Sequence, residues 1–190
     1  LTYIQSACND IGVYATNDII VVTKSTVPVG TNDVMKGWIE EKLKGRHTVH
    51  IVSNPEFLRE GSGIYDFFHG DRIVIGADSE EVARRVESLY SELRLETYVT
   101  DIKSAEMIKY ASNAFLATKI SFINEISNIC EKVGANVLDV AKGMGMDKRI
   151  GASFLNAGIG YGGSCFPKDT KALVQIAGNV AHDFRLLKAV

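Results

Sequence analysis

The chain has 190 residues, of which 46% are hydrophobic and 23% charged, and its formal net charge is −2. This balance is typical of a soluble globular chain with one sizeable core, or of one domain with part of another, and it excludes disorder along the whole length. The small net charge gives no reason to expect nucleic acid or an anionic membrane as a partner. No apolar run reaches the length of a membrane span.

Helices and short β-rich runs alternate over the first hundred residues. Apolar residues at helical spacing predict helices around 4–15, 34–43 and 82–93. An apolar run without polar alternation predicts a buried strand at 19–23, and further short strands are predicted at 49–52, 73–75 and 97–100. The alternation predicts an α/β fold with a parallel, doubly wound sheet.

The pattern changes after Asp101. From about Ile102 to about Val133 there is no Gly and no Pro, which predicts one long helix. A shorter helix around 137–142, a glycine-rich loop over 158–163 and a helix over about 167–177 follow. We therefore expect an α/β domain over 1–101 and an all-helical domain over 102–190. A complete dinucleotide-binding domain begins with a strand and a GxGxxG turn. The chain has no such turn, so if the protein is a dinucleotide enzyme, we expect that part to precede Leu1.

The three cysteines are too widely spaced for a disulfide framework or a zinc site, and the four histidines have no ligand spacing, so no metal is predicted. Cys8 and Cys130 lie on predicted apolar helix faces and are expected to be buried.

Cys165 differs, because it follows three glycines and directly precedes a predicted helix. The helix dipole and Lys168 would both stabilise a thiolate, which makes Cys165 a candidate nucleophile. Asp169 comes one helical turn later and is expected to face the same pocket. The alternative is a glycine-rich turn with a buried Cys and an Asp that complements the dipole.

Three other segments are candidates. Glu56 and Glu60 follow the second strand and, on a helical turn, would form a pair of carboxylates, or else a solvated acidic turn. The stretch from Lys24 to Gly30 follows the first strand and offers hydroxyl and backbone donors, or else is a simple turn with Thr31 or Asn32 as the helix cap. Lys109 and Asn113 lie one turn apart on the long helix and can stabilise an oxyanion, unless the lysine extends to solvent.

Five segments, in order, resemble the UDP-glucose/GDP-mannose dehydrogenase family, and within it the UDP-glucose enzymes more than the GDP-mannose or UDP-N-acetylmannosamine ones. They are KSTVPVG (24–30), SNPEFLREG (53–61), DRIVIG (71–76), KYASNAFL (109–116) and GIGYGGSCFPKD (158–169). The resemblance implies the last part of a Rossmann-type NAD domain followed by a central helical domain that forms a homodimer or higher oligomer, with the C-terminal nucleotide-sugar domain absent. It further implies a cytoplasmic enzyme that uses NAD and a nucleotide sugar.

The resemblance also implies the chemistry, which is the four-electron oxidation of UDP-glucose to UDP-glucuronate through a cysteine thiohemiacetal and thioester. Cys165 resembles the nucleophile, Lys109 and Asn113 the pair that stabilises the C6 oxygen, and Asp169 the acid–base partner of an ordered water. Thr26 and Glu60 match residues that hold this water, and Glu56 matches the carboxylate implicated in thioester hydrolysis. Cofactor contacts are implied for Ser25, Thr26, Val27, Glu60, Cys165 and Lys168, and substrate contacts for Glu56, Phe57, Leu58, Lys109, Asn113, Arg149, Tyr161 and Gly162. Arg149 matches a residue that reaches the neighbouring subunit's site, and Asn156 stands where some relatives have Lys.

Three alternatives remain at this point. In the first, the enzyme oxidises another nucleotide sugar, of the GDP-mannose or UDP-N-acetyl-hexosamine type. A hydroxyacid dehydrogenase is the second, although such enzymes typically use a lysine base and no cysteine nucleophile. A non-catalytic dimerisation fragment is the third.

Overall fold

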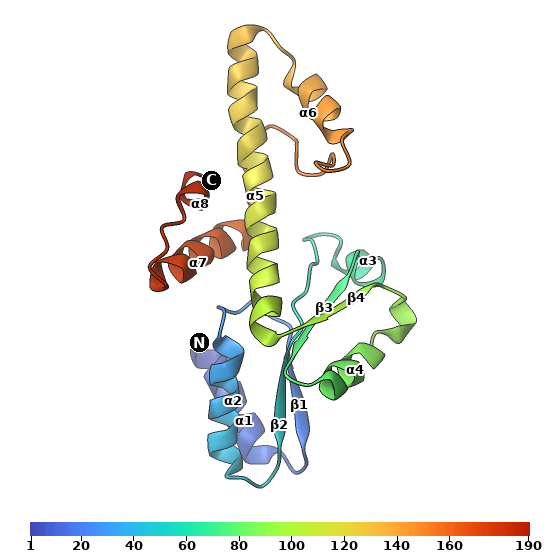
Figure 1. Ribbon diagram of the computed structural model, residues 1–190, viewed down its shortest axis with the longest axis vertical. Helices are drawn as coiled ribbons and strands as arrows, with labels where there is room; N and C mark the ends of the chain where they lie inside the picture. The colour runs from blue at the N-terminus through green and yellow to red at the C-terminus, as the bar shows by residue number, and fades with distance from the viewer. The chain divides into compact units, whose positions relative to one another are not determined.

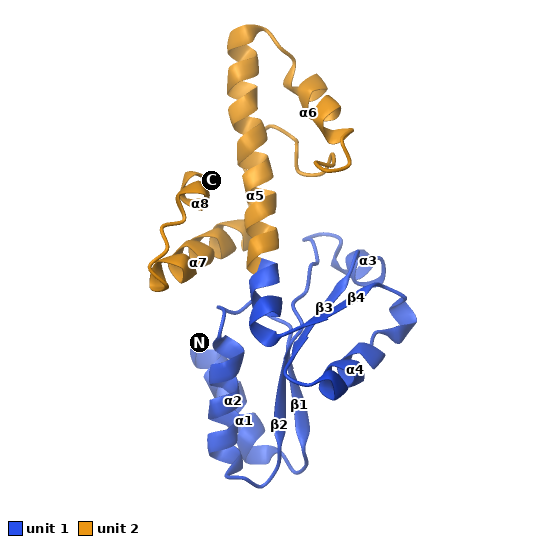
Figure 2. Ribbon diagram, in the orientation of Figure 1, with its two compact units in different colours: residues 1–109 blue, residues 110–190 orange.

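The computed structural model describes all 190 residues, and they divide into two compact units, Leu1–Lys109 and Tyr110–Val190 (Figure 2). Unit 1 contains the sheet, and unit 2 is helical. The boundary between the units falls within one helix, α5 (Ile102–Val133), which is the long helix predicted from the absence of Gly and Pro.

Unit 1 contains four short strands, with one helix before the first strand and the other helices between strands (Figure 1). The strands are β1 (Ile19–Thr23), β2 (Val49–Ser53), β3 (Ile73–Ala77) and β4 (Thr97–Thr100). The helices are α1 (Thr2–Tyr14), α2 (Thr31–Leu43), α3 (Gly63–Phe68) and α4 (Glu80–Ser88), with a 3₁₀ turn, η1 (Ser91–Leu93). The helix predicted over 82–93 thus ends earlier, at Ser88, and α3 was not predicted because six residues are too few to show a helical period.

The strands form one sheet in the order β1-β2-β3-β4. β1 runs parallel to β2 and β3 parallel to β4, but β2 and β3 are antiparallel, with Ser53 opposite Gly76. The α/β class is confirmed, whereas the prediction of a fully parallel sheet is wrong. The reason lies in the connection after β2: its only helix, α3, is six residues long. A parallel return has to run back along the sheet, usually as a helix, and so short a helix spans only about 9 Å.

Two apolar clusters show that both faces of the sheet are covered. On one face Ile51 packs with Cys8 of α1 and Ile39 of α2. On the other, Val52 and Ile75 pack with α4 residues, including Val82 and Val86. Successive β2 residues, Ile51 and Val52, therefore point to opposite helical layers, as the period of a strand requires.

The start of α5 lies directly against β3. A Cβ atom on Gly76 would come within 2.5 Å of the Ala105 Cβ and 2.7 Å of the Asp101 carbonyl oxygen. Only a residue without a side chain fits there. This contact fixes where the first turns of α5 lie on the sheet, and with them Glu106 and Lys109.

Unit 2 contains the remainder of α5, together with α6 (Val137–Gly145), α7 (Cys165–Asn179) and α8 (Arg185–Ala189). The glycine-rich segment before α7 is irregular, as predicted, and α8 was not predicted. Two α5 side chains hold the loops of this unit. The Lys119 ammonium donates to the carbonyls of Ile150 and Gly151, and the Asn124 amide oxygen accepts from the Gly158 N–H at 2.8 Å. No helix of the chain has both the length and the apolar character needed to cross a bilayer.

Candidate functional site

The loop after β1 leaves the carboxyl end of the strand and ends at α2. Val27 is buried in it, Thr26 is half-buried and Ser25 is exposed. The helix cap expected at Thr31 or Asn32 is wrong: Gly30 is the N-cap residue, with φ of +88°, and it supplies no side chain. The free N–H groups at this end of α2 are bonded instead by the carboxylate of Glu106, which belongs to α5.

The loop after β2 is held to the loop after β1 by a buried amide. The Asn54 side chain donates to the Val74 carbonyl at 2.7 Å and accepts from the Lys24 ammonium at 2.9 Å and from the Tyr90 hydroxyl. The Asn54 backbone N–H also donates to the Thr23 carbonyl. The carboxyl ends of β1 and β2 and their two loops therefore form one edge of the sheet, which is where α/β folds bind ligands.

Glu56 and Glu60 do not share a helical turn, so the first of the two alternatives for them, a pair of carboxylates on one helical face, is wrong. The Glu56 carboxylate accepts from the Leu58 backbone N–H at 2.6 Å, which stabilises an irregular turn. Residues 54–59 are accordingly neither helix nor strand. Glu60 is exposed, so the carboxylates belong to different surroundings.

Lys109 does not extend to solvent: it is only 4% exposed. Its ammonium lies 3.4 Å from a Glu56 carboxylate oxygen and 5.2 Å from the centroid of the Phe57 ring. The Arg72 guanidinium lies 4.0 Å from the same ring centroid. Unit 1 thus brings together three of the predicted residues, Glu56, Phe57 and Lys109, around a buried cation.

The end of the same loop is fixed by Asp66. Its carboxylate accepts from the Arg59 backbone N–H, the Arg59 guanidinium and the Ser62 hydroxyl. These bonds, foremost that from the Arg59 side chain, hold the pKa of Asp66 far below its usual range. Asp66 therefore keeps the segment that contains Glu60 folded back on α3.

Unit 2 brings together Asn113, Asp169 and Lys168. The Asn113 amide donates to one Asp169 carboxylate oxygen at 2.7 Å, and the Lys168 ammonium to the other at 2.6 Å. Asp169 is only 1% exposed. A buried carboxylate with an amide and a cation as donors can hold or release a proton at a fixed position, as an acid–base group must.

The helix α7 begins two residues before the predicted start at 167, so that Cys165 is its first residue and does not precede it. It is exposed, whereas Cys8 and Cys130 are buried, as predicted for those two. The Ser164 hydroxyl lies 3.9 Å from its sulfur. The exposed sulfur therefore lies in the first turn of a 15-residue helix, at the positive end of the helix dipole.

Three other predicted substrate contacts, Arg149, Tyr161 and Gly162, lie between α6 and α7, and Leu58 lies in the loop after β2. The Tyr161 ring packs edge-on against Phe166, with 5.8 Å between centroids. Gly162 has open space where a Cβ would stand. Arg149 is exposed and bonded to Asp147, which raises the Arg149 pKa and lowers that of Asp147.

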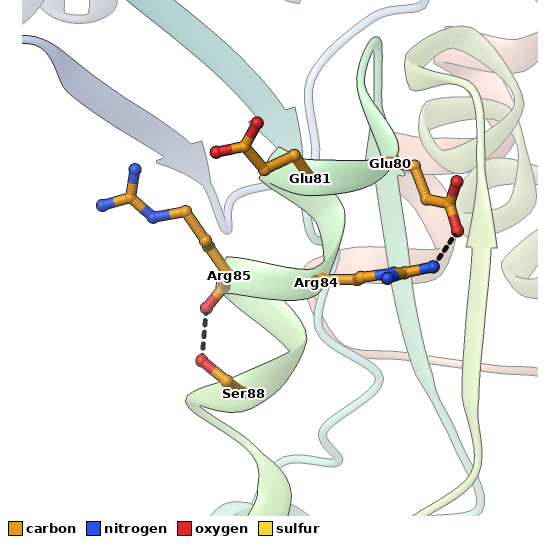
Figure 3. A pocket seen from close by; sticks show the side chains of 5 residues that line it. All are labelled: Glu80, Glu81, Arg84, Arg85 and Ser88. Atoms are coloured by element: carbon orange, nitrogen blue, oxygen red, sulfur yellow. Dashed lines mark hydrogen bonds and ion pairs between the residues drawn. The ribbon is translucent and has the colours of Figure 1, made fainter.

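A shallow hollow lies on the outer surface of α4, lined by Glu80, Glu81, Arg84, Arg85 and Ser88 (Figure 3). Arg84 pairs with Glu80, and the Ser88 hydroxyl donates to the Arg85 carbonyl. None of the predicted site residues lines it. Charged side chains of this kind commonly form the solvent-facing side of a helix, and we assign the hollow no function.

Four residues that position the site were missed by the sequence reasoning: Asn54, Glu106, Lys119 and Asn124. Three of them lie on α5, where a polar residue within an amphipathic helix reads as part of the solvated face. A Glu three residues before a candidate Lys could have drawn attention to Glu106, but its partners are more than 70 residues away in sequence.

Two domain models of one protein family match consecutive parts of the chain. Residues 1–94 match the NAD binding domain of the UDP-glucose/GDP-mannose dehydrogenase family, and residues 103–190 match its central domain. The chain belongs to this family. The resemblance of the sequence to this family is thus confirmed over nearly the whole length of the chain.

Among curated relatives, UDP-glucose 6-dehydrogenase YwqF of Bacillus subtilis is 66% identical over 190 residues, which are 100% of this chain and 43% of that protein. UDP-glucose 6-dehydrogenase TuaD of the same organism is 53% identical, over 100% of this chain and 41% of that protein. The solved UDP-glucose dehydrogenase of Pyrobaculum islandicum superposes with a TM-score of 0.94 at 40% identity, over 98% of this chain and 44% of that one. The chain therefore spans less than half the length of these relatives.

Proposed function

We propose that the protein oxidises UDP-glucose to UDP-glucuronate in two NAD-dependent steps, with Cys165 as the covalent nucleophile. The observation that carries the proposal is the position of Cys165: it is the exposed cysteine of the three and the first residue of α7, in a chain that belongs to a dehydrogenase family. Its relatives named UDP-glucose 6-dehydrogenase reach 66% identity, which favours this sugar.

The residues present suit a dinucleotide cofactor. Ser25 and Thr26 offer hydroxyl donors at the carboxyl end of β1, beside the parallel strand β2. Together with Val27, Glu60, Cys165 and Lys168, they are the residues that we propose to hold NAD. When bound, NAD accepts one hydride from the sugar C6 in each of the two oxidations.

The chain's own residues perform the remaining steps. Asp169, through an ordered water that Thr26 and Glu60 orient, takes the proton from the C6 hydroxyl as the alcohol becomes an aldehyde. The Cys165 thiolate then attacks C6, so that a C–S bond forms and the carbonyl electron pair moves to the C6 oxygen. Lys109 and Asn113, one helical turn apart, stabilise that oxygen.

Loss of the second hydride converts the thiohemiacetal to a thioester. Glu56 takes a proton from a water molecule as the water oxygen attacks C6. The C–S bond then breaks, and its electron pair returns to the Cys165 sulfur as a thiolate. A covalent adduct is needed because a four-electron oxidation must retain the aldehyde between its two halves. Phe57, Leu58, Arg149, Tyr161 and Gly162 are the proposed contacts to the sugar nucleotide.

The test is NADH formation from UDP-glucose by the full-length protein, compared with its Cys165→Ser variant. We expect two NADH for each sugar in the wild type and no steady turnover in the variant. Cys130→Ala is the matched control, because this cysteine also lies in unit 2 but is buried. A Cys165→Ser protein with wild-type turnover would remove the covalent mechanism.

The sugar is tested in the same assay. GDP-mannose is the informative competitor, because the solved GDP-mannose dehydrogenase of Pseudomonas aeruginosa superposes with a TM-score of 0.74 at 33% identity. NADH from GDP-mannose or a UDP-N-acetyl-hexosamine, with none from UDP-glucose, would leave the dehydrogenase chemistry in place and replace the substrate. If no sugar nucleotide yields NADH, the alternative of a non-catalytic dimerisation fragment is favoured.

We also propose that two copies associate through α5. Phe115, Phe122 and Ile129 lie seven residues apart on this helix and are 66%, 49% and 54% exposed. A heptad spacing places them on one side of the helix, as in helix pairs that bury an apolar seam. Phe122→Lys together with Ile129→Lys should therefore yield monomers in light scattering, whereas Leu89→Lys, an exposed apolar position in unit 1, should not.

A further inference from the structure

The N-terminus of α2 is capped by a side chain from another helix. Both oxygens of the Glu106 carboxylate are engaged: one accepts from the Gly30 backbone N–H at 2.6 Å. The other accepts from the Asn32 backbone N–H at 3.0 Å and from the Asn32 side-chain amide at 2.7 Å. Glu106 is 3% exposed and Asn32 is fully buried.

The physical need for such a carboxylate is clear. The first N–H groups of a helix have no partner within the helix, and the N-cap residue Gly30 has no side chain to bond them. A negative charge also complements the positive end of the helix dipole. Glu106 meets both needs from a position 74 residues away in sequence from Asn32.

The same contacts close the loop that precedes α2. The Thr23 hydroxyl, at the end of β1, donates to the Asn32 amide oxygen at 2.6 Å. Asn32 therefore joins the end of β1 to Glu106, and Gly30 is bonded to Glu106 directly. The loop from Lys24 to Val29 is fastened at both ends.

Glu106 also lies three residues before Lys109 on α5, so that the two side chains belong to adjacent turns of one helix. Lys109 contacts Glu56 from the loop after β2, at 3.4 Å. One stretch of α5 thus holds the loops that follow β1 and β2 through two buried side chains of opposite charge.

We propose that Glu106 is a positioning residue that sets the loop of Ser25, Thr26 and Val27 relative to Lys109, and thereby the binding of the dinucleotide. This inference rests on the proposed function, since it takes that loop as the cofactor-binding segment. Glu106 itself contacts only Gly30 and Asn32 in these bonds and is not a catalytic residue.

The test variant is Glu106→Gln in the full-length protein. The amide has one acceptor oxygen in place of two, so its NH₂ group must face either the Gly30 N–H or the Asn32 donors. Loss of a charge-assisted hydrogen bond at a buried site is expected to raise the KM for NAD about tenfold. The KM for UDP-glucose should stay within about twofold, since the substrate loop is held by other residues.

The matched control is Lys103→Ala. Lys103 pairs with Asp33 at 3.0 Å, so it also ties α5 to α2, but both side chains are more than half exposed. An exposed ion pair contributes little, and the control should keep both KM values. Asn32→Ala, which removes one of the three donors and the bond from Thr23, should raise the KM for NAD about threefold.

A second readout separates this inference from the proposed function. Amide hydrogen exchange at Gly30 and Asn32 should be faster in Glu106→Gln and unchanged in Lys103→Ala, whether or not the protein oxidises any sugar. Unchanged exchange and an unchanged KM for NAD would overturn the inference. An equal rise in both KM values with a general loss of exchange protection would also overturn it, because Glu106 would then support the fold alone. If Glu106→Gln does not fold, a wild-type KM for NAD and wild-type exchange in Asn32→Ala overturn it.

Discussion

The Asn113 amide donates to the Asp169 carboxylate at 2.7 Å, joining residues 56 positions apart in the chain. The bond is buried on both sides, and the second carboxylate oxygen is bonded to Lys168. A residue proposed as an oxyanion donor thus also orients the residue proposed as the acid–base group. Changes at Asn113 should therefore affect both stability and activity.

Asn113→Ala leaves one oxygen of a buried carboxylate without a partner. We expect a loss of about 1–3 kcal/mol in the free energy of unfolding, the usual penalty for an unsatisfied buried group. Urea denaturation followed by circular dichroism measures it. Asn128→Ala, an exposed position on the same helix, serves as the control, and equal losses in the two variants would show that the bond to Asp169 contributes nothing.

The three thiols should differ in reactivity. Cys165 is exposed, whereas Cys8 and Cys130 are buried, and burial raises the pKa of the Cys8 thiol, which further suppresses its thiolate. Native protein should therefore release one equivalent of chromophore from an aromatic disulfide reagent, and three after denaturation. Cys165→Ser should release none in the native state. Two fast equivalents in the wild type would contradict the burial of Cys8 or Cys130.

Gly76 should not tolerate a methyl group. Ala at this position would place Cβ 2.5 Å from the Ala105 Cβ, and the nearby backbone of Asp101 cannot yield cheaply. We expect Gly76→Ala to lower the free energy of unfolding by about 1–3 kcal/mol. Thermal denaturation measures the change.

Gly37 provides the opposite case. It lies within α2 with open space around its Cβ position, so Gly37→Ala should stabilise the protein by about 0.5–1 kcal/mol. The prediction is the difference in sign between the two variants. A destabilised Gly37→Ala or a neutral Gly76→Ala would refute it.

Acid should weaken unit 1 through Asp66. Its pKa is lower in the folded chain than in the unfolded chain, because Arg59 and Ser62 bond the ionised form. The stabilisation is therefore complete above the ordinary aspartate pKa of about 4 and is lost as the pH falls toward the depressed folded value. Asp66→Asn should show a shallower loss of urea resistance between pH 5 and pH 2 than wild type. Asp10→Asn, an exposed carboxylate on α1, should follow the wild-type curve.

Much of the fold followed from local pattern, because each long element is marked by its own sequence. The apolar run from Ile19 to Thr23 and the absence of Gly and Pro along α5 needed no tertiary information. The direction of β3 was not accessible in this way, since strand direction depends on how a connection is routed. The same holds for Glu56 and Glu60, whose spacing fits a helix, whereas the bond from the Leu58 N–H to the Glu56 carboxylate stabilises an irregular turn.

The candidate site shows a similar limit. Cys165, Asp169 and Lys109 could be chosen as candidates because a thiol, a carboxylate and an amine are reactive groups, but only the resemblance of their motif segments to the family implied their roles. Glu106 acts only by bonding Gly30 and Asn32, and no local signal reveals partners so distant in sequence.

The single tryptophan of the chain, Trp38, packs against the cluster of Cys8, Ile39 and Ile51 in unit 1. Unit 2 contains no tryptophan, although it contains Cys165 and Asp169. Intrinsic tryptophan emission therefore reports the melting of one unit alone. Ellipticity at 222 nm, to which the helices of both units contribute, is the signal that would reveal whether the unit that contains the reactive cysteine melts at a different temperature.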